Sequence, residues 1–472
     1  MQKKIISITL AILCIFLNGC SDSDSDAYNQ KMGEIQSQRG EESVNPANPS
    51  GKLTVSTYFD GYMMERAKAF MEVHPEVEIQ VIWPESVQGD EDEFETLEMY
   101  GSRIAVELMS GTASDLVDLS HLSAYKYAKS GLLCDLYSFM ENDPSFNKED
   151  YYTNIFKAME YEGHLYELPF AFNYDVMYIS RPISEKLGIE PGEYEGLNYR
   201  QMLDIYEGAK ADKSVSETFG IMPGIVKDSF FKYEFTEFYD AGKCEAWFDS
   251  REFLNYLKTT DEMHTSNGSW EMNYVSSGND EYLNSQYMFS KFCLNAVDTH
   301  NFMIDYKNVW GPVPLVSSGG NFLFDIFLAT YSIPENSQNK ELAWEFLKYC
   351  ISEREPPDSG DKEKILDNFH MYEGWMPINI ANFFSLYRTY CESDLERLAT
   401  SVTLKAGDKE KLLDDALNQI HGWNLQRNKA ASDFELWSLV EADLEYFYYY
   451  DLCTAEETAL IIQDKVTIYL NE

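Results

Sequence analysis

Basic residues are scarce in this chain. Its 472 residues include 37 Lys and Arg against 80 Asp and Glu, and the formal net charge is −43. A surface this acidic repels the phosphates of nucleic acids and the headgroups of anionic lipids. We therefore expect no nucleic-acid partner and no electrostatic docking of the protein body on a membrane.

Cysteine pairs at metal-binding spacing are also missing. None of the eight cysteines forms a C-x-x-C pair, and the seven histidines never fall at the spacing of zinc ligands. We expect no metal and no cofactor. Six cysteines remain beyond residue 20, and apolar neighbours favour buried free thiols over disulfides, which stay possible outside the cytoplasm. These six are Cys134, Cys244, Cys293, Cys350, Cys391 and Cys453.

Motifs of common catalytic sites are absent as well. The chain has no Gly-x-Ser-x-Gly, no His-Glu-x-x-His and no glycine-rich phosphate loop. We therefore expect a protein that is not an enzyme. An extracellular glycoside hydrolase or lyase stays open as an alternative, because 80 acidic residues offer many carboxylate pairs.

Long apolar runs are absent except at the N-terminus. There, Lys3 and Lys4 precede an apolar run from Ile5 to Leu17. A helix of that length reaches about 20 Å, which is too short to span a hydrocarbon core of about 30 Å. A charged start, a short apolar stretch and a small-residue cleavage site are typical of a secretory signal, here residues 1–19.

The end of that apolar run resembles a bacterial lipobox, because Cys20 directly follows Gly19. The resemblance implies that Cys20 becomes the first mature residue and carries lipid; a plain signal peptide with an accidental cysteine is the alternative. Residues 20–50 begin with alternating Ser and Asp, and we expect a solvated tether there. The implied location is extracytoplasmic, with the protein anchored by lipid to the bacterial cell membrane.

Aromatic residues are plentiful. Phe, Trp and Tyr make up 15% of the chain, with 33 Tyr among them. Aromatic rings stack on the C–H faces of sugars, while polar side chains bond the hydroxyls. Most of these rings must lie in the core, so the informative ones stand in loops at strand ends, where open α/β sheets bind ligands.

The first folded segment is predicted to be a βαβ unit. Residues 53–59 read as a strand, Met63 to Phe70 share one helical face, and residues 77–83 alternate as a second strand. Two strands joined by a helix within so few residues predict a parallel sheet and the α/β class. A third short strand is predicted at residues 116–119.

Later segments are predicted to be mainly helical. We expect a helix from Tyr125 to Leu136, an amphipathic helix around Leu342 to Leu347, and a helical tail from Asp408 onward. Thr454 and Glu457 fit a capping box at the start of the last helix.

Several segments resemble family 1 of the extracellular solute-binding proteins, the sugar-binding lipoproteins of ATP-binding-cassette importers, to which maltose-binding protein is distantly related. The family's opening strand and helix match residues 53–77. Its Gly-x-x-Pro-Asp element is similar to residues 111–115, with Ser114 in place of proline. The other similar segments, in family order, are 127–133, 163–169 with His164 in place of lysine, 339–346 and 375–379. Residues 178–180 depart from the usual Tyr-Asn.

The resemblance implies a two-lobed, type II periplasmic-binding-protein-like fold, with a ligand cleft between lobes joined by crossing strands. The lobes expected from it are residues 51–169 plus 321–365, and residues 170–320 plus 366–472. The implied function is capture of a carbohydrate, an oligosaccharide first of all, by lobe closure. Delivery to permease subunits would follow, with the binding protein acting as a monomer.

The resemblance also implies a set of ligand-binding residues at strand ends and loop entries. Asp115 carries a second interpretation, because an Asp at this position also caps a turn. The set is Tyr58, Asp60, Asp115, His121, Asn173, Tyr174, Trp270, Trp310, Gly320 with its neighbour Gly319, and Trp375.

Two further interpretations remain open at this point. The same fold serves as a surface glycan-binding receptor or sensor that has no permease. A solute-binding protein for a non-sugar ligand, such as a polyamine, would suit the acidic charge.

Overall fold

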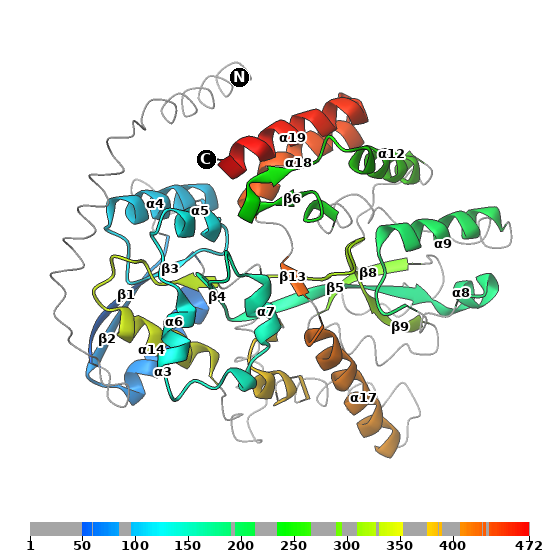
Figure 1. Ribbon diagram of the computed structural model, residues 1–472. Coiled ribbons are helices and arrows are strands. Elements are labelled where there is room, and N and C mark those ends of the chain that lie inside the picture. The colour runs from blue at the N-terminus through cyan, green and yellow to red at the C-terminus, as the bar shows by residue number, and fades with distance from the viewer. Residues whose placement is uncertain are drawn as a thin grey trace. The chain divides into compact units, whose positions relative to one another are not determined.

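The computed structural model describes a mixed α/β chain with two main sheets (Figure 1). The described residues are 50–58, 60–84, 96–189, 194–212, 234–265, 289–294, 309–326, 330–352, 375–385, 387–388, 406–426, 428–430 and 434–471. The predicted signal peptide, Cys20 with its predicted lipid, nearly all of the predicted tether, and Trp270 lie outside them. Within the described part of the chain, no helix is both long and apolar enough to cross a membrane.

The first sheet has five strands in the order β2-β1-β3-β11-β4. Its strands are β1 (Gly51–Ser56), β2 (Val77–Ile82), β3 (Leu116–Asp118), β4 (Leu168–Pro169) and β11 (Thr330–Ser332). β1 pairs in parallel with both β2 and β3, while β11 runs antiparallel to β3 and β4. The predicted parallel βαβ unit is therefore confirmed, with α3 (Asp60–Val73) as its helix.

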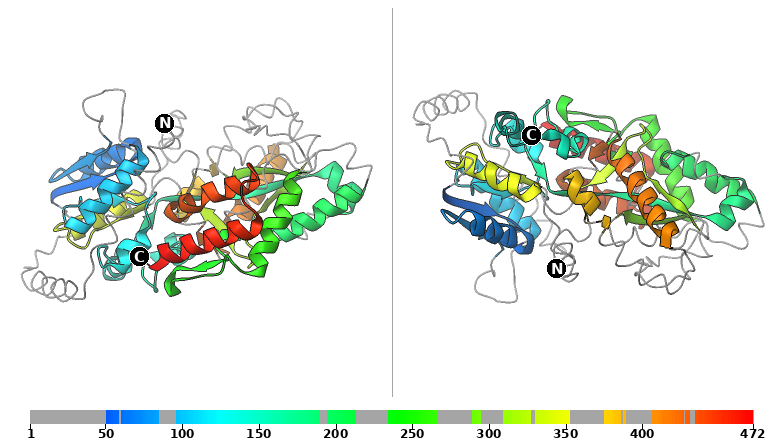
Figure 2. Two further views of the ribbon diagram at one scale, coloured as in Figure 1. Left: turned by 90° about the horizontal axis from the view of Figure 1, so that it is seen from above. Right: turned by 90° about the horizontal axis from the view of Figure 1, so that it is seen from below.

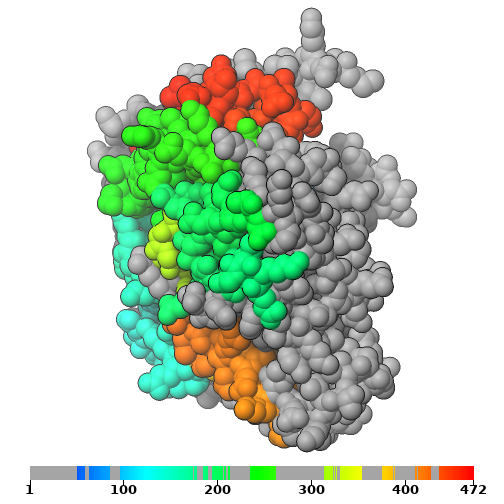
Figure 3. Space-filling model, turned by 90° about the vertical axis from the view of Figure 1, so that its right-hand side faces the viewer, coloured from blue at the N-terminus to red at the C-terminus, as the bar shows by residue number. Residues whose placement is uncertain are grey.

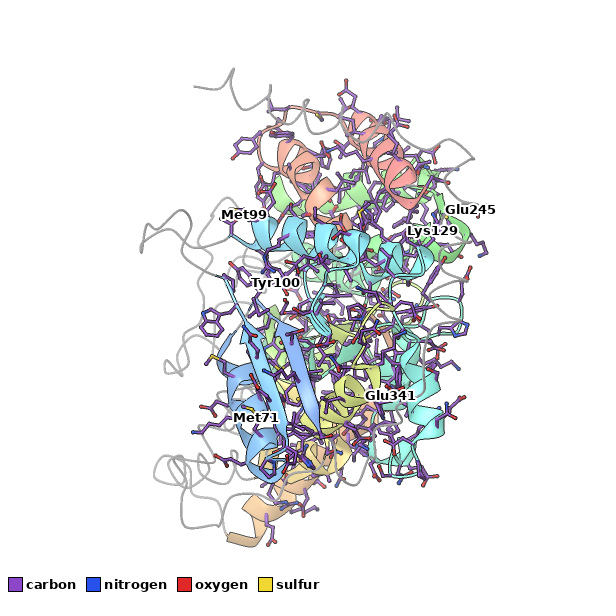
Figure 4. All side chains as sticks on the ribbon, turned by 90° about the vertical axis from the view of Figure 1, so that its left-hand side faces the viewer. Met71, Met99, Tyr100, Lys129, Glu245 and Glu341 are labelled. Carbon is purple, nitrogen blue, oxygen red and sulfur yellow. The ribbon has the colours of Figure 1, made fainter. Side chains whose placement is uncertain are left out.

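Helices cover both faces of this sheet (Figures 1 and 2). α3 and α14 (Lys340–Ile351) lie on one face, where Leu116 joins their core, and α4 (Leu97–Ser110) lies on the other with Val117. Adjacent residues of β3 thus serve opposite cores, as the alternation of a strand requires. Figure 4 shows Tyr100 on the side of α4 that faces the strands and Met99 at its outer end.

The predicted helix from Tyr125 to Leu136 is wrong in its extent. The structure has α5 (Ala124–Lys129) and a separate α6 (Leu136–Asn142). Gly131 between them has φ of +67°, a left-handed conformation that ends a helix and that glycine adopts without a Cβ penalty. α7 (Thr153–Ala158) follows before the chain reaches β4.

The second sheet has six strands around β5 (Ala171–Ser180). Its path is β12-β5-β10-β13, and β8 and β9 also pair with β5. These partners are β8 (Phe289–Leu294), β9 (Val309–Pro314), β10 (Phe322–Asp325), β12 (Met376–Pro377) and β13 (Asn428–Ala430). Only Phe170 separates β4 of the first sheet from β5, so the chain crosses between the sheets within one residue. It returns between β10 and β11.

Helices accompany the second sheet, and parts of α9 (spring-green) and α17 (orange) reach the surface on the side shown in Figure 3. They are α8 (Arg181–Leu187), α9 (Tyr199–Ala211), α12 (Arg251–Thr265), α17 (Ala406–Asn424), α18 (Phe434–Tyr448) and α19 (Ala455–Asn471). A short hairpin of β6 (Tyr239–Asp240) and β7 (Glu245–Ala246) lies near α19. We call the first sheet with α3, α4, α5 and α14 the first lobe, and the second sheet with α8, α9, α12, α18 and α19 the second lobe.

The predicted capping box of the last helix is confirmed. The Thr454 hydroxyl accepts from the Glu457 amide at 3.2 Å, and the Glu457 carboxylate accepts from the Thr454 amide at 2.9 Å. Of the six cysteines, the four whose side chains the structure describes are free thiols: Cys134, Cys244, Cys350 and Cys453.

Candidate functional site

The parallel strands of the first lobe end together at one edge of their sheet. Tyr58 follows β1, Trp83 follows β2, and the segment from Asp118 to His121 follows β3. Because parallel strands present their carboxyl ends on the same side, these residues share that edge. We call this set the strand-end edge.

Aromatic rings gather at the strand-end edge. The ring of Tyr58 packs edge-on against Tyr100 with centroids 5.6 Å apart, and against His121 with centroids 6.4 Å apart. His121 is buried, Tyr58 is half-buried, and the Trp83 side chain is 41% exposed. The edge therefore carries an exposed indole and a supported phenol, and rings of both kinds are suited to stacking on a flat apolar face.

One buried carboxylate underlies this edge. Asp118 is 1% exposed and accepts hydrogen bonds from the Tyr58 amide at 3.2 Å and the Ser120 amide at 2.9 Å. The hydroxyls of Thr57 and Ser120 donate to it as well. Burial raises the pKa of Asp118, against the opposing effect of these hydrogen bonds. Sequence reasoning placed Asp118 in the right segment but gave it no role.

Asp115 lies at the opposite end of β3. Its Oδ2 accepts from the amide and the hydroxyl of Thr54, each at 2.9 Å. Its Oδ1 accepts from Ser337 at 2.8 Å and Asn339 at 3.1 Å, in the segment that enters α14. The carboxylate thus ties together β1, β3 and α14, in keeping with the structural interpretation of this residue.

In the second lobe, a turn from Ser317 to Asn321 carries the predicted Gly320. Gly320 has φ of +74°, which favours glycine, and its predicted neighbour Gly319 approaches Glu237 closely. A Cβ on Gly319 would lie 2.6 Å from a Glu237 carboxylate oxygen, so a larger residue would displace that side chain. Asn321 also donates to Glu237, at 3.1 Å.

A second buried carboxylate underlies this turn. Glu234 is 1% exposed and accepts from both the amide and the hydroxyl of Ser318, each at 2.7 Å. Burial raises the pKa of Glu234 to about 7, against the lowering effect of the Ser318 hydrogen bonds. Sequence reasoning missed Glu234, because nothing in a list of 80 acidic residues marks the buried ones.

The other predicted site residues belong to the second lobe or to the entrance of the first helix. Asn173 is buried on β5, opposite Asp325 of β10. Trp375 is half-buried beside the larger core and precedes β12, which pairs with the start of β5. For Asp60 on α3, Tyr174 on β5 and Trp310 on β9, the structure describes only the backbone.

Polar contacts also join α5 to the C-terminal helices. Lys126 forms an ion pair with Glu435 at 3.0 Å, and its ammonium lies 3.8 Å from the ring centroid of Tyr469. The hydroxyl of Tyr125 donates to the carbonyl of Leu470 at 3.0 Å. α5 begins three residues after His121. The loop between β3 and α5 therefore connects the strand-end edge to the contacts between α5 and the C-terminal helices.

Among the described residues, no group of three or more His, Cys, Asp or Glu side chains is arranged to hold a metal ion. The chemistry offered by the described edge is therefore that of aromatic faces, amides, hydroxyls and buried carboxylates.

Comparison with known proteins gives one family and many similar folds. The family described as "bacterial extracellular solute-binding protein" matches residues 56–355. Among curated protein sequences, none matches this chain.

Solved structures with this fold include sugar-binding proteins. An ABC substrate-binding protein from Listeria monocytogenes in complex with cycloalternan is 15% identical, with a TM-score of 0.51 over 89% of this chain and 99% of that one. The sugar-binding protein MalE from Xanthomonas citri is 13% identical, with a TM-score of 0.57 over 89% of this chain and 98% of that one. A family 1 extracellular solute-binding protein from Alicyclobacillus acidocaldarius is 14% identical, with a TM-score of 0.53 over 90% of this chain and all of that one.

Proposed function

Because this chain belongs to the bacterial extracellular solute-binding proteins, we propose that it captures a carbohydrate outside the cytoplasm and passes it to the permease of an ATP-binding-cassette importer. The family membership predicted from the ordered motifs is confirmed, and so is the two-lobed, type II α/β fold. The family consists of binding proteins that do not catalyse reactions. The sugar, the permease and the lipid anchor are our proposals.

The strand-end edge is the observation that carries the sugar proposal. Tyr58 and Trp83 offer aromatic faces, and His121 lies against the Tyr58 ring. Rings of this kind stack on sugars, whose hydroxyls then need hydrogen-bonding partners nearby. Two similar folds support the same ligand class, since one is named a sugar-binding protein and the other holds cycloalternan.

We propose that ligand contacts come from both lobes. The first lobe contributes Tyr58, Asp60, Trp83 and His121. The second contributes Asn173, Tyr174, Trp270, Trp310, Gly320 and Trp375. Asp115 is left out of this set, because its carboxylate is occupied by Thr54, Ser337 and Asn339.

Closure of the lobes would couple binding to transport. A ligand favours a closed form only through contacts that exist when both lobes reach it at once. The chain passes between the lobes at Phe170, between β10 and β11, and between α14 and β12, and such a rotation would occur about these passages. A permease would then distinguish the closed, loaded form from the open one.

Thermal-shift measurements with defined sugars test the proposal. The soluble body, residues 50–472, is mixed with maltotriose, cycloalternan, cellotetraose and xylotetraose, and with spermidine as the non-sugar comparison. A ligand at 100 times its dissociation constant adds about 2.7 kcal/mol to the unfolding free energy and raises the melting temperature. A shift with spermidine and with none of the four sugars would overturn the carbohydrate assignment.

Trp375→Ala should weaken binding of the active sugar about tenfold, since it removes a stacking face.

Lipid attachment is tested separately in cells. Cys20→Ala removes the thiol that the lipobox resemblance assigns to lipid, so the protein should appear in the medium or the soluble fraction. Its affinity for the active sugar should stay unchanged. Retention of the variant in the membrane fraction would rule out an anchor on Cys20.

A further inference from the structure

Asp118 stands where three strands of the first lobe converge. It is the last residue of β3, beside the end of β1, and its neighbour in the sheet on the other side is Tyr331 of β11. Its side chain is 1% exposed, so it lies behind the strand-end edge and does not form part of its surface.

All the donors to this carboxylate named above are neutral. They are the amides of Tyr58 and Ser120 and the hydroxyls of Thr57 and Ser120. The Thr57 hydroxyl is also 2.8 Å from the hydroxyl of Tyr331, which extends the network to β11. A carboxylate buried among dipoles is costly to desolvate, and four converging donors offset that cost only if their positions are fixed.

The geometry fixes two of the proposed ligand residues through their backbone. Tyr58 is held by its own amide, and His121 follows Ser120, whose amide and hydroxyl both donate to Asp118. The carbonyl of Asp118 in turn accepts from Tyr100, whose ring supports Tyr58. An apolar residue at this position would leave two amides and two hydroxyls without this acceptor.

We propose that Asp118 is the positioning residue of the strand-end edge: it does not touch the solute but sets the placement of Tyr58 and of the Ser120–His121 turn on which affinity depends. This inference rests on the proposed function. It gives Asp118 a role that the family resemblance did not give it. It also predicts that affinity for the solute can be lost without any change to a side chain that contacts the solute.

Asp115, which directly precedes β3, provides a matched control. Both carboxylates accept four hydrogen bonds; Asp118 binds residues that follow β1, whereas Asp115 binds Thr54 within β1 at the end of β3 remote from the edge. Asp118→Asn and Asp115→Asn each replace one acceptor oxygen by an NH₂ group that faces donors. Both variants should lose stability, whereas only Asp118→Asn should disturb the edge.

Hydrogen exchange of the ligand-free protein gives the first readout. In Asp118→Asn, the amides of Tyr58 and Ser120 should exchange at least tenfold faster, while amides of α14 stay as in the wild type. In Asp115→Asn the pattern should be reversed, with faster exchange at the start of α14. Unchanged protection of Tyr58 and Ser120 in Asp118→Asn would overturn the proposal, whether or not a sugar binds.

Calorimetric titration with maltotriose and cycloalternan gives the second readout. Asp118→Asn should weaken binding at least tenfold, and Asp115→Asn should stay within twofold of the wild type. Equal losses in the two variants would assign both carboxylates to general stability and refute a positioning role. If the wild type binds neither sugar, maltotriose and cycloalternan are not its ligands, and exchange alone decides the role of Asp118.

A milder variant guards against a failure to fold. Ser120→Ala removes one hydroxyl donor and leaves the carboxylate with its two amides and Thr57. It should fold and weaken sugar binding about threefold, with faster exchange at Ser120. Wild-type exchange and wild-type affinity in Ser120→Ala, together with an unfolded Asp118→Asn, would count against the proposal.

Discussion

Two carboxylates of this protein, Asp143 in the first lobe and Glu234 in the second, are both buried, yet their pKa values shift in opposite directions. Burial raises the pKa of Asp143, but hydrogen bonds from Lys348, Ser145 and Trp344 outweigh it and lower the pKa to about 2. Burial raises the pKa of Glu234 to about 7, and the Ser318 hydrogen bonds do not compensate. The two pKa values shift in opposite directions because Asp143 has a cation beside it: the Lys348 ammonium lies 2.6 Å from its carboxylate.

The comparison shows that burial alone does not decide whether a carboxylate stabilises a fold. A buried carboxylate with a cation beside it stabilises the folded state at neutral pH here, whereas one whose neutral donors do not offset its burial opposes folding once it ionises. The three predictions that follow test this rule, from the largest expected effect to the smallest.

Glu234→Gln should have the largest effect. Between pH 4.5 and about 7 the folded state binds a proton that the unfolded state has released, so the wild type loses stability as pH rises through this window. The full difference corresponds to about 3 kcal/mol. Glu234→Gln should remove this loss and be more stable than the wild type at pH 8, as measured by urea unfolding.

Glu237→Gln serves as the control for Glu234. Glu237 contacts the same turn through Asn321 but is only half-buried. Because the charge of Glu237 adds to the raised pKa of Glu234, this variant should reduce the fall in stability between pH 4.5 and 8 without removing it. The same slope in Glu234→Gln as in the wild type would show that the buried carboxylate is not its source.

Asp143→Asn should have the next largest effect, with the opposite sign. The lowered pKa means that Asp143 contributes its full stability above about pH 4, and that this contribution is lost as pH falls toward 2. At pH 7 the variant should be about 2 kcal/mol less stable than the wild type, and its acid unfolding should be less steep. The exposed Asp150→Asn is the control, with an expected change of about 0.5 kcal/mol or less. An Asp143→Asn variant as stable as the wild type at pH 7 would contradict the rule that a buried carboxylate paired with a cation stabilises the fold.

Lys126→Gln should have the smallest effect on stability. Its ion pair with Glu435 is partly exposed, with side chains 24% and 37% accessible, so it contributes about 0.5–1 kcal/mol. Because the pair joins the first lobe to the second, its loss should also weaken binding of the active sugar two- to fivefold. Glu435→Gln should do the same, and the double variant should lose no more than either single one.

Arg103→Gln is the matched control for this pair. Arg103 and Glu107 form an ion pair of similar exposure within α4, so its loss breaks no contact between the lobes, although Arg103 Cζ also lies 5.1 Å from the ring centroid of Tyr100. A decrease in sugar affinity in Arg103→Gln equal to that in Lys126→Gln would show that the effect comes from charge alone and not from the link between lobes.

Local patterns predicted the fold more reliably than they predicted long-range contacts. The βαβ unit and the capping box at Thr454 are confirmed, since each depends on a short stretch whose periodicity or side chains carry the signal. The predicted helix from Tyr125 to Leu136 is wrong because its apolar spacing continues past Gly131, where the backbone turns left-handed. The left-handed conformation of Gly131 interrupts the helix, although the apolar spacing on both sides of it favours one.

The strand-end edge could be predicted from the sequence as a region and not residue by residue. The resemblance led to the ends of β1 and β3, but it gave Asp118 no role and passed over Trp83. Asp118 and Asp115 look alike in sequence, three residues apart, one at the end of a short strand and the other directly before it. Their hydrogen-bond partners come from segments that only the folded chain brings near. Asp118 accepts from Thr57 and Tyr58, and Asp115 accepts from Ser337 and Asn339.

The position of β11 in the first sheet has a consequence for synthesis. β11 separates β3 from β4, although it lies far beyond both in the sequence. A chain emerging from the ribosome therefore cannot complete its first sheet until residues 330–332 have been translated, well after the long strand β5. A truncated gene product that stops before Thr330 would keep the parallel strands but lack the strand that joins β4 to them, so the first lobe cannot be expressed as a simple N-terminal fragment.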